Sequence, residues 1–435
     1  MVENIPKYRE LKSPIAVQTE LTPKCNNVCG YCYNSWRGNT QLESELNLKN
    51  HLKIAQEIVN NEVFETVLTG GEPLLRRDLL YPLANFYSKK NLEISFNTNL
   101  ILINSEDILK IKDSGILGVL GSLPSCDKET YNLITQTKNF EKAIKGIELL
   151  VNGKIPLAIN MVVLKSNKHQ VYETGKFIHN MGVHNFCGTP ASPSKYLKKK
   201  DELLIPEILN TLDDLLRLQE DFGMSVDIVE PLPRCITKEP KKYEQFFKRD
   251  CAAGKLTAVI SSSGNIRPCT HVPLEYGNIL REGLSTLWKK MQDWRNGSMT
   301  PNECGTCDET FICSMGCREV SKLKHDNYKT IDPWCNPNNA KERTFFLKEI
   351  NLKDHETYKI QPNIKYRNEE NSKKLIFEPQ SRLIALVNKD LFSFVSELSR
   401  RKTFNIGNIK QEFGDKSLKI IKYLKSKNII KLQEV

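Results

Sequence analysis

Three cysteines lie close together near the start of the chain, within the segment CNNVCGYC. They are Cys25, Cys29 and Cys32. Soft thiolates on one short loop can hold a single iron–sulfur cluster. Three ligands for a four-iron cluster leave one iron open to a small molecule. The alternative is a structural zinc site, but such a site requires a fourth ligand and usually shows paired C-x2-C spacing, which this loop lacks.

A second candidate feature is the segment TGGEP, which starts at Thr69 and lies about 40 residues after the cysteine loop. It follows a short β-branched run that is typical of a strand. Gly70 and Gly71 permit close approach of the backbone at a strand end, and Glu72 supplies a carboxylate that could face a ligand ammonium. Alone this segment could be an ordinary turn, but together with the cysteine loop it predicts a small-molecule site.

Seven further cysteines lie within 85 residues, from 251 to 335. They are Cys251, Cys269, Cys304, Cys307, Cys313, Cys317 and Cys335. Seven thiols are too many for one tetrahedral zinc, so two clusters fit the count better than one ion, with a two-zinc site as the alternative. The chain has 13 cysteines and its polar N-terminus is not a secretory signal, which favours metal ligation over disulfides.

The elements that must position these residues follow a βα pattern from about residue 15 to 220. Strands are predicted at 15–20, 66–69, 92–97, 117–122, 157–163 and 185–187, and helices at 49–60, 78–89, 106–114, 140–151, 170–181 and 207–221. Six βα units predict an α/β fold with a parallel sheet, either doubly wound or a partial (β/α)6 TIM-type barrel. In both arrangements the chemistry lies at the C-terminal ends of the strands.

Two further regions follow this α/β domain. From 251 to 335 the periodicity is weak, and we expect bound metal to replace a large apolar core there. The last 80 residues predict a hairpin at 363–366 and 374–377, helices at 389–399, 406–413 and 416–427, and a closing strand at 429–432. This order indicates a small winged-helix-like α+β domain behind a polar linker at about 348–361.

Charge and hydropathy limit the classes of partner. The net charge is +11, and residues 355–435 hold 17 Lys or Arg against 9 Asp or Glu. Such a basic tail indicates an acidic partner, either a peptide or a nucleic acid, or simply a solvated lysine-rich surface. No apolar run approaches the ~20 residues of a membrane span, so we expect a cytoplasmic protein without a membrane partner.

The spacing C-x3-C-x-aromatic-C resembles that of the radical S-adenosylmethionine superfamily. The resemblance implies that the three loop cysteines hold a [4Fe-4S] cluster whose open iron binds the amino and carboxylate groups of S-adenosylmethionine. An external one-electron reductant then drives formation of a 5′-deoxyadenosyl radical. Tyr31 would lie against the adenine, and Gly70, Gly71 and Glu72 match the family's GGE motif for the methionine amino group. Weaker matches for ribose or carboxylate contacts are Asn97, Asn99, Ser122 and Asn160.

The second cysteine set resembles the SPASM domain, the auxiliary-cluster module of peptide- and protein-modifying enzymes. This resemblance implies two more [4Fe-4S] clusters, three in all. An inner cluster would use Cys251, Cys269 and Cys317, and an outer cluster would use Cys304, Cys307, Cys313 and Cys335. The inner set lacks a fourth cysteine, so either one iron is open or Cys235 completes the set. Cys126 and Cys187 follow predicted strands and are either small buried residues or hydrogen-atom donors.

The tail resembles, more loosely, the PqqD-like RiPP recognition element, through Tyr366-Arg367-Asn-Glu369 and the hairpin and helices after it. The resemblance implies that a leader peptide adds as a strand to the hairpin edge. The predicted domains are therefore a barrel at 1–225, a SPASM domain at 226–347, a linker at 348–362 and a peptide-binding domain at 363–435.

The hypothesis from the sequence is a maturase of a ribosomally synthesised peptide, which removes hydrogen by the 5′-deoxyadenosyl radical and forms a thioether or carbon–carbon crosslink. Epimerisation and decarboxylation are alternatives. A dehydrogenase of the sulfatase-maturating type is disfavoured by the missing inner cysteine and the additional tail. A tetrapyrrole-modifying enzyme would not use a peptide-docking domain. A non-catalytic iron–sulfur regulator that binds nucleic acid through its tail would not need Glu72.

Overall fold

The computed structural model describes residues 10–34, 45–249, 251–310, 313, 315–341, 350–379 and 383–433. The chain divides into two compact units, Tyr8–Thr344 and a smaller unit formed by Phe345–Val435 with Met1–Lys7. Each unit has its own core of buried apolar residues.

The larger unit is built on one sheet of nine strands in the order β7-β6-β5-β4-β3-β2-β1-β8-β9. The strands are β1 (Ala16–Glu20), β2 (Glu65–Thr69), β3 (Glu93–Thr98), β4 (Gly118–Ser122), β5 (Leu157–Val163), β6 (Asn185–Pro190), β7 (Ser225–Asp227), β8 (Thr257–Ile260) and β9 (Ile266–Arg267). All neighbouring pairs are parallel except β8 and β9. The six predicted strands are confirmed, as is the α/β class with a parallel sheet.

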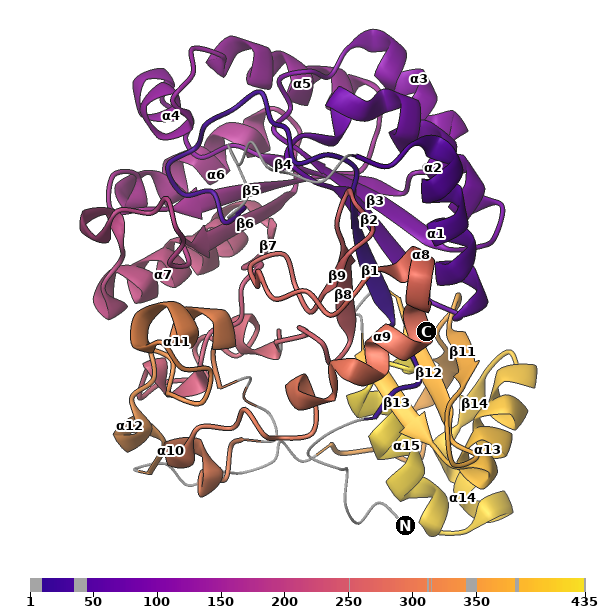
Figure 1. Ribbon diagram of the computed structural model, residues 1–435. Helices are drawn as coiled ribbons and strands as arrows, with labels where there is room; N and C mark the ends of the chain where they lie inside the picture. Colours follow the sequence, from indigo (N-terminus) through magenta and orange to yellow (C-terminus); the bar gives the residue numbers. More distant parts are fainter. Residues whose placement is uncertain are drawn as a thin grey trace. The chain divides into compact units, whose positions relative to one another are not determined.

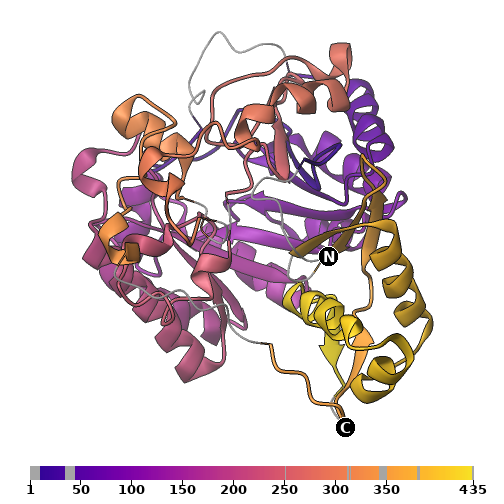
Figure 2. The ribbon, with the colours of Figure 1, turned by 90° about the horizontal axis from the view of Figure 1, so that it is seen from below.

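Helices follow the strands and lie along the outer side of the curved sheet (Figures 1 and 2). They are α1 (Leu48–Asn60), α2 (Arg77–Ser88), α3 (Ser105–Asp113), α4 (Lys128–Thr135), α5 (Phe140–Asn152), α6 (Val171–Asn180) and α7 (Ile205–Phe222). Burial alternates along β3, β4 and β5, because one side chain in two packs into the helix layer. The other side chains stay half-buried on the inner face of the sheet, where a ligand could reach them.

The cysteine-rich stretch does not depend on metal alone, which corrects the prediction that it lacks an apolar core. Its strand β8 pairs in parallel with β1 and extends the sheet. Trp288 is fully buried and its Nε1 donates to the carbonyl of Leu11 at 2.7 Å. The remaining helices of this unit are α8 (Ile279–Glu282), α9 (Leu284–Lys290), α10 (Asn302–Gly305), α11 (Arg318–His325) and α12 (Pro337–Lys341). The first part of this stretch therefore shares the core of the barrel.

The smaller unit contains two three-stranded antiparallel sheets, β14-β10-β15 and β11-β12-β13. Its elements are β10 (Thr357–Ile360), β11 (Lys365–Asn368), β12 (Lys374–Glu378), β13 (Leu383–Val387), α13 (Lys389–Arg400), β14 (Phe404–Asn405), α14 (Ile406–Phe413), α15 (Lys416–Ser426) and β15 (Ile430–Leu432). The predicted hairpin, helices and closing strand are confirmed. The stretch 348–362 is not linker throughout, because β10 lies within it and pairs with β14 and β15; residues 348–349 lie outside the described part.

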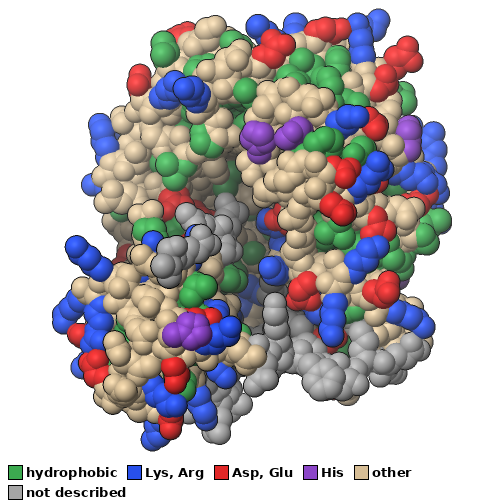
Figure 3. Space-filling view, turned by 180° about the vertical axis from the view of Figure 1, so that it is seen from behind, with side chains coloured by type: hydrophobic (Ala, Val, Ile, Leu, Met, Phe, Trp, Pro, Cys, Tyr) green, Lys and Arg blue, Asp and Glu red, His purple; other side chains and the backbone are tan. Residues whose placement is uncertain are grey.

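Charged side chains of both signs are interspersed on the face shown in Figure 3, with Lys and Arg beside Asp and Glu. Among the described helices, none combines the length and the apolar character needed to cross a membrane.

Trp288→Ala tests whether the cysteine-rich stretch depends on the shared core. We expect the free energy of unfolding to fall by about 3–5 kcal/mol, since a fully buried indole and its hydrogen bond are lost. Denaturant unfolding followed by circular dichroism measures the change. Leu280→Ala, at a position that is 38% exposed, is the control and should cost under about 1 kcal/mol. Equal effects of the two substitutions would contradict the shared core.

Candidate functional site

The segment that leads into the cysteine loop packs against the backbone of Gly70 and Gly71. After β1 the chain passes over the turn after β2, and Gly71 N–H donates to Thr22 O at 2.7 Å while Glu72 N–H donates to Lys24 O at 2.9 Å. A Cβ atom on Gly71 would lie 2.0 Å from Lys24 O. Gly70 has a φ of +139° and a Cβ there would lie 2.4 Å from Thr22 O. Only glycine permits this contact at both positions.

Glu72 links this contact to the first cysteine through Asn99. The Glu72 carboxylate is fully buried and accepts hydrogen bonds from Leu74 N–H, the Thr98 hydroxyl and Asn99 N–H, at 2.8–3.1 Å. The side-chain Nδ2 of Asn99 lies 3.7 Å from Cys25 Sγ. Burial raises the pKa of Glu72 to about 7. A carboxylate has about four acceptor positions, so three hydrogen bonds leave one for a ligand cation.

The rest of the loop rests on α4, a helix that was not predicted. Val28 N–H and Gly30 N–H donate to the carbonyls of Thr135 and Ile134, at 3.3 and 3.1 Å. Tyr31 Oη lies 3.2 Å from Ser122 Oγ at the end of β4. Burial raises the pKa of Tyr31 well above its usual value. The Tyr31 side chain is thus anchored to the sheet.

Polar residues predicted to contact the cofactor lie on the inner face of the sheet. The parallel register pairs Ser122 with Asn160 and Asn160 with Cys187, so these three positions form a row across β4, β5 and β6. Asn160 Oδ1 accepts a hydrogen bond from the Thr189 hydroxyl at 2.7 Å. Asn97 is half-buried on β3. Only Ser122 ends its strand, because Asn160 lies in the middle of β5 and Cys187 is the third residue of β6; the prediction of strand-end positions is thus met by Ser122 alone in this row.

The predicted inner set comes together in the structure. Cys251 and Cys317 are buried, and the charges of Cys251 and Cys269 both act on Cys317. Burial raises the pKa of Cys269 to about 12. A bare thiolate is therefore costly at this position, whereas a bound metal cation would stabilise it.

An aromatic contact joins the first loop to the inner set. Tyr33, the residue after Cys32, stacks on His271 with ring centroids 4.6 Å apart and an interplanar angle of 11°. His271 Nε2 lies 3.2 Å from Glu230 Oε1. Sequence reasoning missed all three residues because they come from distant segments. The available signals were the positions of Tyr33, directly after Cys32, and of His271, two residues after Cys269.

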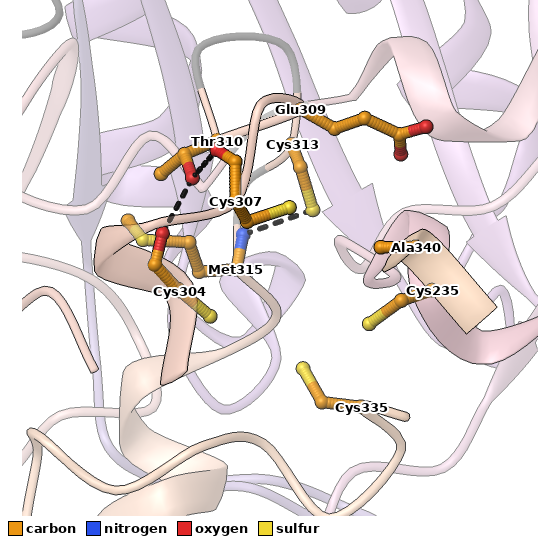
Figure 4. A pocket seen from close by; sticks show the side chains of 9 residues that line it. All are labelled: Cys235, Cys304, Cys307, Glu309, Thr310, Cys313, Met315, Cys335 and Ala340. Carbon is orange, nitrogen blue, oxygen red and sulfur yellow. Dashed lines mark hydrogen bonds between the residues drawn. The ribbon is translucent and has the colours of Figure 1, made fainter. Parts of the chain in front are cut away.

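The predicted outer set lines a partly open cavity, shown in Figure 4. About 290 Å³ in the cavity and at its mouth is not filled by protein atoms, a volume that includes open solvent. Its lining residues are Cys235, Cys304, Cys307, Glu309, Thr310, Cys313, Met315, Cys335 and Ala340. Cys235 thus lies in the outer set, which corrects the alternative that it completes the inner set. The inner set keeps three cysteines.

Backbone contacts hold the outer cysteines in place. The Thr310 hydroxyl donates to the carbonyls of Cys304 and Cys307, each at 2.6 Å. Asp332 Oδ2 accepts the backbone N–H of Cys317 at 2.8 Å, and Asp332 O accepts that of Cys335 at 2.8 Å. Asp332 therefore ties the last inner cysteine to the last outer one.

The donor chemistry of these three sites fits iron–sulfur clusters. Among the described residues, no three His, Cys, Asp or Glu side chains lie as the ligands of a single ion would. The outer sulfurs instead surround a space, as thiolates around a multi-iron cluster do. Three cysteine sites in one unit could move electrons, and the first could also bind an amino acid beside Glu72.

Family models match the two cysteine-bearing regions. The model of the radical SAM superfamily matches residues 19–178, and the model of the SPASM iron–sulfur cluster-binding domain matches residues 251–308.

Three curated proteins illustrate the range of relatives. The AdoMet-dependent heme synthase of Methanosarcina barkeri is 23% identical over 74% of this chain and 96% of that protein. The probable GTP 3′,8-cyclase of Methanococcus maripaludis strain C5 is 33% identical over 67% of this chain and 92% of that protein. The mycofactocin maturase MftC of Mycolicibacterium smegmatis is 24% identical over 77% of this chain and 87% of that protein.

Two solved structures share the fold. Streptococcus suis SuiB bound to precursor peptide SuiA aligns with a TM-score of 0.63 at 18% identity, covering 74% of this chain and 76% of that one. Native anSMEcpe with bound AdoMet aligns with a TM-score of 0.61 at 20% identity, covering 75% of this chain and 96% of that one.

Gly71→Ala tests the backbone contact under the first loop. We expect the loop to be displaced by the new Cβ, so that anaerobic reconstitution yields about four fewer irons per chain. Iron and sulfide analysis measures the loss, with circular dichroism to check folding. Gly30→Ala, within the cysteine loop itself, is the matched control, because a Cβ there meets only Gln136 Nε2 at 3.6 Å. An unchanged iron content in Gly71→Ala would contradict the role of the glycine pair.

Proposed function

The chain belongs to the radical S-adenosylmethionine superfamily, and from this premise we propose that it is an enzyme that matures a ribosomally synthesised peptide. The observation that carries the proposal is the combination of three cysteine sites in one unit with a separate small unit whose sheet has β11 at an edge. Peptide-modifying proteins occur among its relatives, since MftC is a maturase and SuiB binds a precursor peptide.

Residues of the first loop hold and orient the cofactor in this proposal. Cys25, Cys29 and Cys32 would ligate a [4Fe-4S] cluster, and Glu72 would accept a hydrogen bond from the methionine ammonium. When bound, the cluster and S-adenosylmethionine together supply a 5′-deoxyadenosyl radical that removes hydrogen from the peptide. The Tyr31–Ser122 contact keeps the aromatic ring on the sheet, and Asn160 lies further along the same inner face.

Two auxiliary clusters would complete a set of three [4Fe-4S] clusters. The inner set of Cys251, Cys269 and Cys317 would leave one iron open, since Cys235 lines the other pocket. An open iron could bind a polar group of the substrate. The outer set would pass electrons to or from a one-electron partner. A thioether or carbon–carbon crosslink requires removal of two hydrogen atoms and suits such electron-accepting sites.

The smaller unit supplies a candidate surface for the leader peptide. Strand β11 is an edge of its sheet and can accept an added strand. Tyr366 on β11 is 40% exposed and packs edge-to-face on Phe392 of α13, with centroids 5.3 Å apart. Lys374 lies over the same Phe392 ring, 4.9 Å from its centroid. The edge strand and the helix thus offer an aromatic and basic surface that suits an acidic peptide.

Two of the residues that carried the resemblance have a structural role. Arg367 Nε donates to Glu369 Oε1 at 2.7 Å, and both side chains are buried. Removal of one partner would take a charge-assisted hydrogen bond from the other buried side chain. This pair therefore stabilises the sheet, and Tyr366 is the member of the motif that can contact a peptide.

A second candidate function rests on the match to the heme synthase over 96% of that relative. In that case the substrate would be a tetrapyrrole. If the chain instead acts like the GTP cyclase that it matches, the substrate would be a nucleotide. Incubation with each substrate class under identical conditions distinguishes these activities from peptide maturation.

Mass spectrometry of a candidate precursor peptide tests the proposal. After anaerobic incubation with enzyme, reductant and S-adenosylmethionine, we expect the peptide to lose two hydrogen atoms per crosslink and 5′-deoxyadenosine to accumulate. Cys29→Ala should abolish both products, since its loop cannot hold the cluster. An unmodified peptide alongside turnover of a tetrapyrrole or GTP would contradict the maturase. Loss of carbon dioxide would indicate decarboxylation instead of a crosslink.

Tyr366→Ala in the full chain tests leader docking. We expect the dissociation constant for a fluorescent acidic leader peptide to rise at least about tenfold, equal to about 1.4 kcal/mol, because an aromatic contact at the strand edge is lost. Phe413→Ala is the matched control, since Phe413 of α14 is 39% exposed and packs edge-to-face on Phe394 and not on Phe392. Equal weakening by both substitutions, or none by either, would rule out docking at β11.

A further inference from the structure

The loop between β6 and α7 carries a cluster of exposed lysines. They are Lys195, Lys198, Lys199 and Lys200, and the segment 195–200 is called the lysine loop below. It lies shortly after the last residue of β6. Because β1 to β6 are parallel, it emerges at the same edge of the sheet as the cysteine loop after β1 and the glycine pair after β2. In a parallel α/β sheet this edge is where substrates bind.

Apolar packing holds the middle of the lysine loop close to the first cysteine site. Leu197, which lies between the lysines, packs against a small apolar cluster. Tyr31 of the cysteine loop packs against the same cluster. The buried members of this cluster are Ile134, Leu164 and Ala191. The lysines are therefore carried by a segment that shares its packing with the cysteine loop.

Polar contacts fasten the end of the lysine loop. Asp201 N–H donates to Lys198 O at 2.9 Å, and Asp201 O accepts from the backbone N–H of Lys165 after β5 at 3.1 Å. Glu202 forms an ion pair with Lys324 of α11 at 2.6 Å. The loop is thus tied both to the barrel and to the cysteine-rich stretch. A loop fixed in this way has little conformational freedom to lose when it binds a ligand.

The four lysines carry more charge than their surroundings compensate. The loop contains two acidic residues, Asp201 and Glu202, and Glu202 is already paired with Lys324. Within the part of the chain that the structure describes, none of the four lysines forms an ion pair. Like charges this close in sequence repel one another, and an anionic ligand relieves that repulsion.

We propose that the lysine loop binds acidic residues of the peptide substrate that lie near the residue to be modified. This assignment rests on the proposed function, which brings a peptide to this edge of the sheet, and it adds the charge of that peptide. Exposed lysines attract carboxylates over about 8 Å at physiological ionic strength. They would speed the encounter and hold the segment close to the first cysteine site. The lysines are positioning residues, separate from the leader surface on β11.

Zero-length crosslinking of the full chain tests this surface without relying on activity. The probe is a synthetic decapeptide of Glu-Gly repeats, and its Gln-Gly counterpart is the neutral control. We expect a carbodiimide to join the acidic peptide to Lys198, Lys199 or Lys200, as mapped by mass spectrometry. The yield should fall as salt shortens the Debye length from about 10 Å to about 3 Å. Crosslinks that map only to other lysines, or a yield that does not depend on salt, would overturn the proposal.

Removal of a lysine pair gives the second measurement. Lys199→Gln with Lys200→Gln is compared with Lys89→Gln with Lys90→Gln, an exposed pair between α2 and β3 at the opposite edge of the sheet. Both variants also carry Tyr366→Ala, which weakens the proposed leader site. We expect the dissociation constant of the fluorescent Glu-Gly peptide to rise about fivefold in the first variant and less than about twofold in the second. Equal effects would contradict a role of the lysine loop.

Kinetics and competition identify the role and the class of anion. With a precursor peptide as substrate, the variant that lacks Lys199 and Lys200 should show a raised KM and an unchanged kcat, because neither side chain contacts the reacting atoms in this proposal. A lowered kcat at unchanged KM would overturn the positioning role. If GTP or a tetracarboxylate porphyrin blocks the crosslinks at lower concentration than the unlabelled Glu-Gly peptide does, the loop binds a different substrate class and the peptide assignment fails.

The two proposals fail in different ways. If the acidic peptide is crosslinked to the lysine loop while no precursor is modified, the proposed function fails and the anion-binding surface stands. If a precursor is modified while crosslinks avoid the loop and KM is unchanged in the Lys199 and Lys200 variant, the assignment of the lysine loop alone fails.

Discussion

The contact between two backbone segments, the chain after β1 and the glycine pair after β2, positions the first cysteine loop. Gly71 lies so close to Lys24 O that any side chain at this position would push the loop away. The same turn buries Glu72, whose carboxylate holds Asn99 beside Cys25. The loop, the acidic residue and the third strand are therefore coupled through a few short contacts, and none of them can move alone.

Strand β1 also couples this site to the rest of the larger unit. It lies between β2 and β8, so the barrel and the cysteine-rich stretch share one sheet. The first loop and the inner set meet where Tyr33 stacks on His271. Asp332 links the inner and outer sets by backbone hydrogen bonds. Sheet pairing, aromatic stacking and backbone hydrogen bonds thus hold the three cysteine sites in one folded unit.

The smaller unit has a core of its own, with Tyr358, Leu398 and Ile421 among its buried residues. The buried Arg367–Glu369 pair stabilises one of its sheets. Strand β10 pairs with β15 in the other sheet, so the unit contains more than the predicted hairpin and helices. In the proposed function, this unit would bind the peptide and the larger unit would carry out the chemistry. This division suits an enzyme that must recognise one part of a substrate and alter another.

The sequence by itself determined the parallel α/β fold, the three cysteine groups and the elements of the tail, because periodicity and cysteine spacing are local properties. It did not reveal α4 under the loop, the extension of the sheet by β8, or the membership of Cys235 in the outer pocket. These features depend on contacts between residues far apart in the chain. Only the tertiary structure could decide them, since no local pattern encodes which distant segments meet.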